Sequence, residues 1–186
     1  AYVRGDRGAD NEVATADDIA RMAEIVEEGA RAGALGFSTS RTKLHRAVDG
    51  REVPGTFAHA DEMMGIGRAL GRAGHGVFEI ASDLAPAAEE FEWMTRLARE
   101  TGLPVSYALV QNEVEPDKWR ELLQWTEAAQ AAGTPLTAQV ACRPAGLLYG
   151  LEGRLHPFVG HPTYKGISRL PFEERVRLMR DPDFKA

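Results

Sequence analysis

The chain has 186 residues, of which 44% are hydrophobic and 27% charged, a balance typical of folded globular proteins. The formal net charge of −6 and the scattered arginines argue against a nucleic-acid partner, because phosphates require clustered Lys and Arg. No apolar run approaches the roughly 20 residues needed to cross a bilayer, so no membrane partner is expected. The single cysteine, Cys142, cannot form an internal disulfide, and the cytoplasm is the expected location.

A helix followed by a strand is predicted near the start of the chain. Thr15, with the acidic Asp18 three positions later, is typical of a capped helix start, and apolar residues at helical spacing extend the helix to Gly33. The apolar residues 34–37 then predict a short buried strand, and residues 38–41 are expected to form its polar tip.

Three more helix–strand units follow in the same order. Their helices are expected over residues 61–73, 86–102 and 116–133, and their strands over residues 76–81, 104–110 and 135–141. The strands are apolar without clean alternation, which favours parallel pairing with helices as covers. Repeated βα units place the chain in the α/β class, and both part of a (β/α)8 TIM-type barrel and a doubly wound sheet fit the pattern.

The βα pattern stops beyond Arg143. Frequent turn residues predict a long loop with at most a short helix, and Pro171 then begins an amphipathic helix that ends before Asp181. No linker divides the chain, so residues 1–186 are expected to form a single segment. Because the chain has no initiator methionine, we expect an interior part of a larger enzyme that is inactive without its missing strands.

Active sites of parallel βα folds form at the carboxyl ends of the strands. Polar residues near these ends are the candidates for substrate binding, namely Ser38, Thr39, Arg41, Glu79, Gln111 and Arg143. Either arginine could hold a substrate carboxylate through its forked donors, and Arg143 could equally pair with an acidic neighbour. Glu79 lies in an apolar strand, where a carboxylate is rare unless paired or functional. Ser82 and Asp83 are interpreted as caps of the next helix.

Histidine and cysteine give little indication of a metal centre. No two histidines have the spacing of a ligand pair on a helix or strand, and the weak candidates are His156 and His161, each followed by proline. A single loop histidine is more often a surface residue than a ligand. Cys142 has no basic partner nearby and is expected to be a buried thiol. These patterns leave the catalytic residues unassigned.

One segment is similar to a known family. Residues 32–42 read AGALGFSTSRT and are continued by similar residues at 45–46, 49–50 and 53–56, with weaker similarity at 3–8, 119–123 and 155–158. The chain thereby resembles the D-aminoacylase (N-acyl-D-amino-acid deacylase) branch of the metal-dependent amidohydrolase superfamily, amidohydrolase family 3. The resemblance implies the interior of a (β/α)8 barrel that hydrolyses the amide bond of N-acyl-D-amino acids, a non-peptide C–N bond, with metal-activated water.

The resemblance also implies zinc or another divalent metal in the full-length protein, although this segment need not bind it. The family's His-x-His pair and late aspartate would lie upstream and downstream. Two further metal histidines are expected at the positions of Ala81 and Leu109, and a substrate-binding lysine at that of Gln111. Neither an alanine nor a leucine side chain can replace imidazole as a ligand.

Three functions therefore remain open. The first is an amide hydrolase whose partner is a small molecule of the N-acyl amino acid class. The second is a non-catalytic small-molecule-binding barrel that has lost the standard metal centre, and fold alone cannot separate these two. The third is a doubly wound domain that uses a diffusible cofactor, against which the lack of a glycine fingerprint counts. The patterns do not predict the oligomeric state.

Overall fold

The computed structural model describes residues 2–47, 49–112, 115–143, 146, 148–153 and 156–185. Its contacts divide the chain into two compact units, Ala1–Ala141 and Cys142–Ala186. No boundary is visible in the composition of the sequence at this point. That both units belong to one barrel domain stays a prediction.

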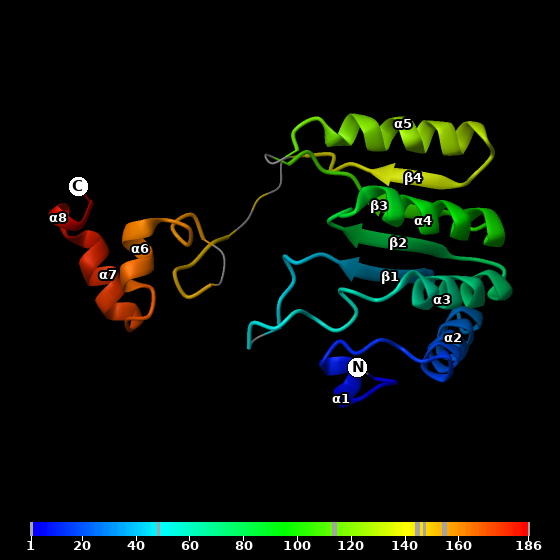
Figure 1. The fold of residues 1–186 in the computed structure, drawn as a ribbon, viewed down its shortest axis with the longest axis horizontal. Coiled ribbons are helices and arrows are strands. Elements are labelled where there is room, and N and C mark those ends of the chain that lie inside the picture. The colour runs from blue at the N-terminus through cyan, green and yellow to red at the C-terminus, as the bar shows by residue number, and fades with distance from the viewer. Residues whose placement is uncertain are drawn as a thin grey trace. The chain divides into compact units, whose positions relative to one another are not determined.

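Within the described ranges, the first unit contains one parallel sheet of four strands. Neighbouring strands follow chain order throughout, and each strand pairs in parallel with the next (Figure 1). A doubly wound sheet would reverse its strand order at a switch point, whereas successive order is that of a barrel wall. The α/β architecture is thus that of part of a TIM-type barrel. The strands are β1 (Gly36–Arg41), β2 (Val77–Ser82), β3 (Val105–Ala108) and β4 (Leu136–Gln139).

Strand β1 begins later than predicted. Residues 38–41, expected as a polar tip, form most of the strand, while Leu35, expected inside it, precedes it and is 89% exposed. The prediction was wrong because it took polarity to mean the end of the strand. In β1 the polar residues occupy both faces of the strand, and Phe37 is its one large apolar residue.

The helices of the first unit agree with the predicted positions to within a few residues. Pro86 is the residue before its helix and does not lie in the first turn. A short helix near the start of the chain was not predicted. The helices are α1 (Asp6–Ala9), α2 (Ala16–Arg31), α3 (Ala60–Ala73), α4 (Ala87–Thr101) and α5 (Lys118–Ala131).

The core lies between the sheet and the helices α3 to α5, which cover one face of it (Figure 1). Alternate strand residues are fully buried there, among them Phe78, Ile80 and Tyr107. The Tyr107 ring contacts Phe91 edge-on at 6.0 Å between centroids, and its hydroxyl is 2.8 Å from Thr126 Oγ1. Burial raises the pKa of Tyr107. Every second strand position therefore anchors the sheet to its helices.

A buried ion pair joins the end of β1 to α4. Arg41 donates from Nε to Glu90 Oε2 at 2.9 Å and from Nη2 to Glu90 Oε1 at 2.6 Å, and it also donates to the carbonyl of Ala58. The two side chains are only 12% and 9% exposed. The guanidinium carbon lies 5.7 Å from the centroid of the Trp93 ring. This two-bond geometry fixes the end of the first strand against the helix layer.

Three short helices lie in the described part of the second unit. Tyr164, in the first of these helices, is buried, accepts a hydrogen bond from Arg175 Nη1 at 2.8 Å, and meets the ring of His156 edge-on at 4.7 Å between centroids. The helix expected after Pro171 is present, and the short helix after it was not predicted. The helices are α6 (Pro162–Ile167), α7 (Phe172–Arg180) and α8 (Pro182–Lys185).

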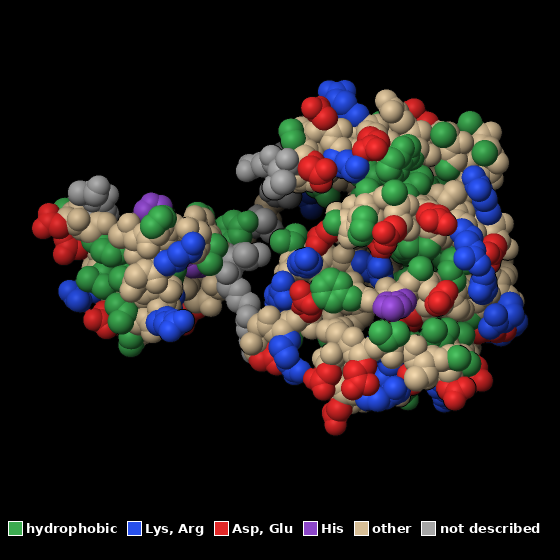
Figure 2. Space-filling view, viewed as in Figure 1, with side chains coloured by type: hydrophobic (Ala, Val, Ile, Leu, Met, Phe, Trp, Pro, Cys, Tyr) green, Lys and Arg blue, Asp and Glu red, His purple; other side chains and the backbone are tan. Residues whose placement is uncertain are grey.

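Charges on the surface are mixed. Figure 2 shows Lys and Arg side chains interspersed with Asp and Glu over the visible face of the first unit. Among the described residues, no helix combines the length and the apolar character that a membrane crossing requires.

The start of α2 predicts an acid-sensitive step in stability. Asp18 Oδ2 accepts from the backbone N–H of Thr15 at 2.9 Å, and Arg7 donates to both carboxylate oxygens at 2.7 Å. The Thr15 N–H first, and then Arg7, lower the pKa of Asp18 from 3.8 to about 2. A carboxylate whose pKa is lower in the folded state stabilises the fold above its unfolded pKa, so this contribution is lost as the pH falls from about 4 to about 2.

Urea unfolding between about pH 5 and about pH 2 measures this effect. We expect Asp18→Asn to be less stable than the wild type at about pH 5 and to lose less stability than the wild type as the pH falls to about 2. The matched control is Asp17→Asn, in the same helical turn but exposed. Equal pH dependence in the wild type and Asp18→Asn would contradict the assignment.

The burial of the Arg41–Glu90 pair predicts a large loss of stability when one partner is removed. Arg41→Met leaves the Glu90 carboxylate buried without its cation, and we expect the free energy of unfolding to fall by about 3–5 kcal/mol. The exposed pair Arg21–Glu24 provides the control, because Arg21→Met should cost less than about 1 kcal/mol. The double variant Arg41→Met/Glu90→Met should recover part of the loss in urea unfolding. An equal fall in the free energy of unfolding for Arg41→Met and Arg21→Met would contradict the prediction that the buried pair contributes more to stability.

Candidate functional site

The two-residue period of the strands separates the predicted site residues onto opposite faces of the sheet. Thr39 and Arg41 belong to the same face of β1 as Phe37, which packs against the helix-covered core. Ser38 and Ser40 point to the other face, which would line the interior of a closed barrel and is called the inner face here. The structure therefore brings Ser38 and Glu79 together and does not bring Thr39 or Arg41 to them.

One row of polar residues crosses all four strands on the inner face. The register pairs each with the next in the order Ser38, Glu79, Ser106 and Thr137. We call these four residues the inner row. Ser38 Oγ donates to Glu79 Oε2 at 2.6 Å, and Glu79 is half-buried. Glu79 therefore has a hydrogen-bond partner, and its role in substrate binding stays a prediction.

Ser106 differs from its neighbours in the inner row. It is only 6% exposed, and within the described part of the chain its Oγ has no hydrogen-bond partner. A buried hydroxyl without a partner costs free energy, so such a group calls for an explanation. Ser106 and Thr137 were missed in the sequence. The feature that could have revealed them is one polar residue in each predicted strand, at positions that pair with one another across the sheet.

The next inner-face level toward the carboxyl ends contains three small residues and Gln139. Ser40 pairs with Ala81, and Ala108 pairs with Gln139. Ala81 and Ala108 each follow an inner-row residue two positions later on the same strand. Because their side chains are single methyl groups, Ala81 and Ala108 add little bulk to this level of the inner face, where Glu79 is half-buried and Ser106 is buried.

Arg41 has a structural partner. Three of its N–H groups donate to Glu90 and to the carbonyl of Ala58. This engagement argues against the expected role of Arg41 as a clamp for a substrate carboxylate. Glu90 was not recognised as its partner because the two residues are 49 positions apart.

Ser82 and Asp83 do not cap the next helix, so that prediction was wrong. The residue before α4 is Pro86, which offers no side-chain cap. Ser82 Oγ donates to Glu90 Oε2 at 3.1 Å. The Asp83 carboxylate accepts from the Thr42 hydroxyl at 2.5 Å and from the backbone N–H of Lys43 at 2.9 Å. Ser82 therefore links the end of β2 to α4, and Asp83 ties the segment after β2 to the segment after β1.

The remaining substrate candidates are exposed. Gln111 follows β3 and donates from Nε2 to the carbonyl of Pro116 at 3.0 Å. Arg143 belongs to the second unit, where its side chain is exposed. A role for either residue in substrate binding stays a prediction.

The two loop histidines lie in different surroundings. His156 is buried against Tyr164, and its Nδ1 accepts from the backbone N–H of Phe158 at 3.2 Å. A neutral imidazole that accepts at Nδ1 carries its proton on Nε2, so neither nitrogen has a free lone pair for a metal. His161 is exposed and precedes α6. Cys142 is exposed, so the prediction of a buried thiol was wrong.

The described residues do not form a divalent-metal centre by themselves. Within the described ranges, no three or more His, Cys, Asp or Glu side chains are grouped closely enough to hold an ion. Ala81 is half-buried on the inner face and Leu109 is buried after β3. Neither can ligate a metal.

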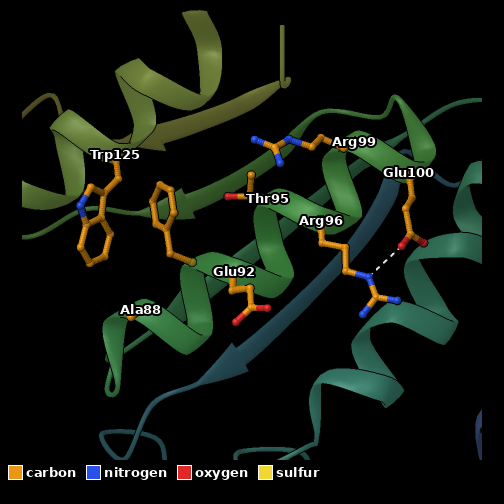
Figure 3. Close-up of a pocket in the computed structure, with 8 residues that line it drawn as sticks. Ala88, Glu92, Thr95, Arg96, Arg99, Glu100 and Trp125 are labelled. Atoms are coloured by element: carbon orange, nitrogen blue, oxygen red, sulfur yellow. Dashed lines mark hydrogen bonds and ion pairs between the residues drawn. The ribbon is translucent and has the colours of Figure 1, made fainter. Parts of the chain in front are cut away.

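A groove of about 630 Å³ lies on the helix side of the first unit (Figure 3). Phe91 and Trp125, from α4 and α5, form its apolar part, with ring centroids 5.3 Å apart. Arg96 and Glu100 lie at its border and form an ion pair at 2.8 Å. Because these helices cover the outer face of the sheet, the groove does not adjoin the inner row.

Comparison with known proteins identifies the family. The model of the amidohydrolase family matches residues 1–186. No curated protein and no solved structure matches the chain. Amidohydrolases are hydrolases and are generally metal-dependent. The sequential parallel βα units agree with the barrel of such enzymes. Since the family model spans both units, the chain belongs to the amidohydrolase family.

Proposed function

We propose that the full-length protein is a deacylase of the D-aminoacylase type, which hydrolyses the amide bond of N-acyl amino acids. The observation that carries this proposal is the Ser38–Glu79 hydrogen bond of 2.6 Å on the inner face of an amidohydrolase barrel wall. It places a half-buried carboxylate next to a hydroxyl where two small residues, Ala81 and Ala108, follow toward the carboxyl ends of the strands.

Amide hydrolysis requires a proton carrier, and Glu79 has the chemistry for this role. Its carboxylate can take a proton from a water molecule while the water oxygen attacks the carbonyl carbon. The same proton then moves from Glu79 to the amide nitrogen as the C–N bond breaks. The Ser38 hydroxyl holds Oε2, which leaves Oε1 for the transfer. Zinc or another divalent metal in the full-length protein belongs to the same proposal, with ligands beyond the residues described.

A non-catalytic binding barrel is the second candidate. It is favoured by Ala81 and Leu109, which stand where the family resemblance implies metal histidines. Such a protein would bind N-acyl amino acids through the same inner face and would release them unchanged.

The proposed function is tested with the full-length protein and N-acetyl-D-amino acids, with the L-enantiomers measured in parallel. We expect turnover, and we expect Glu79→Gln to lower kcat by a factor of about 100 or more, since proton transfer typically contributes 10²–10⁴. Glu92→Gln makes the same chemical change on the exposed side of α4 and should leave the rate unchanged.

Three measurements would contradict parts of the proposal. Full activity of Glu79→Gln would show that Glu79 is not the proton carrier. Faster hydrolysis of the L-enantiomers would show that the enzyme is not of the D-aminoacylase type. Binding without turnover, together with a metal content of zero by elemental analysis of the purified protein, supports the binding barrel instead.

A further inference from the structure

The inner row contains an unneutralised charge beside an unsatisfied hydroxyl. In the part of the chain that the structure describes, Glu79 has the Ser38 hydroxyl as its partner and forms no ion pair. Its register neighbour on β3 is Ser106, which is only 6% exposed. Within the described ranges, Ser106 Oγ has no hydrogen-bond partner. A ligand that donates hydrogen bonds to both groups would satisfy both deficits.

The geometry of a parallel sheet places these two groups within reach of one ligand atom. Side chains at paired positions of adjacent strands stand about 4.8 Å apart on the same face. Ser106 Oγ makes no direct hydrogen bond to Glu79, so it can still accept one from a ligand. A single nitrogen with several N–H groups can donate to Glu79 Oε1 and Ser106 Oγ together.

The charge of the inner row selects the class of ligand. It contains one carboxylate and otherwise neutral hydroxyls, and the flanking level adds Ser40, Ala81, Ala108 and Gln139, none of them charged. Ca²⁺ takes about six to eight oxygen ligands, carboxylates among them, and Mg²⁺ requires near-ideal octahedral geometry. One negative charge with nearby hydroxyls matches a monovalent ammonium group instead.

We infer that Glu79 and Ser106 form a subsite for a protonated primary amine. The inference rests on the proposed function for its biological ligand: the amine released by deacylation is an amino acid whose ammonium group would occupy this subsite. Ser106 is then a substrate-positioning residue that the strand pattern alone did not reveal. The released amino acid should accordingly act as a competitive inhibitor.

The probe for this subsite is n-butylammonium chloride, with butan-1-ol as the uncharged analogue of equal length. Calorimetric titration of the full-length protein should show binding of the ammonium and much weaker binding of the alcohol. Glu79→Gln should weaken ammonium binding roughly tenfold or more, because it removes a charge-assisted hydrogen bond. Glu92→Gln, the same change on the exposed side of α4, should not alter it.

Ser106→Ala separates a binding role from a packing role. Removing a buried hydroxyl that has no partner should leave thermal stability equal or higher, and ammonium binding should weaken roughly tenfold. A change in stability with unchanged binding would assign Ser106 to packing and overturn its part in the subsite.

The outcomes distinguish this inference from the proposed function. Equal affinity for ammonium and alcohol, or unchanged ammonium affinity in Glu79→Gln, overturns the subsite whether or not the protein hydrolyses amides. Ammonium binding that depends on Glu79 and Ser106 in a protein without deacylase activity supports the subsite and refutes the proposed reaction.

Discussion

The opposite orientation of successive strand residues is the constraint on which the structure depends. One set of positions, represented by Phe78, Ile80 and Tyr107, is fully buried under helices α3 to α5. The other set is released from packing against those helices and carries Glu79 and Ser106. Apolar contacts on one face hold the sheet in place, and polar groups can therefore accumulate on the other without loss of the core.

The charged side chains on the two faces of the sheet have different partners. Arg41 and Glu90 neutralise one another on the helix side, where two-point hydrogen bonding offsets the cost of removing both charges from water. Among the described residues, the Glu79 carboxylate on the inner face accepts a hydrogen bond only from the Ser38 hydroxyl. A carboxylate left without a cation keeps its capacity to accept a proton or to attract a positive ligand. The ion pair thus has a structural role, and Glu79 is the charged residue for which we propose a chemical role.

Much of the fold was predictable because helix starts, terminal glycines and apolar runs are local signals. The helix from Ala16 to Arg31 follows from the Thr15 cap and the spacing of its apolar residues. The site was less predictable, because contacts such as Arg41–Glu90 depend on long-range pairing. Thr39 was grouped with Ser38 because the two are adjacent in sequence, although adjacent strand residues point in opposite directions. Ser106 became visible only once the strand register was known.

The order β1-β2-β3-β4 also has a consequence for how the wall is assembled in time. Each strand hydrogen-bonds to the one that precedes or follows it along the chain, so every pairing closes a loop of one helix and its connections. Loop closure over such separations costs less conformational entropy than pairing the ends of the chain. A nascent chain could add one βα unit at a time to a wall already formed, with the newest strand as the template for the next.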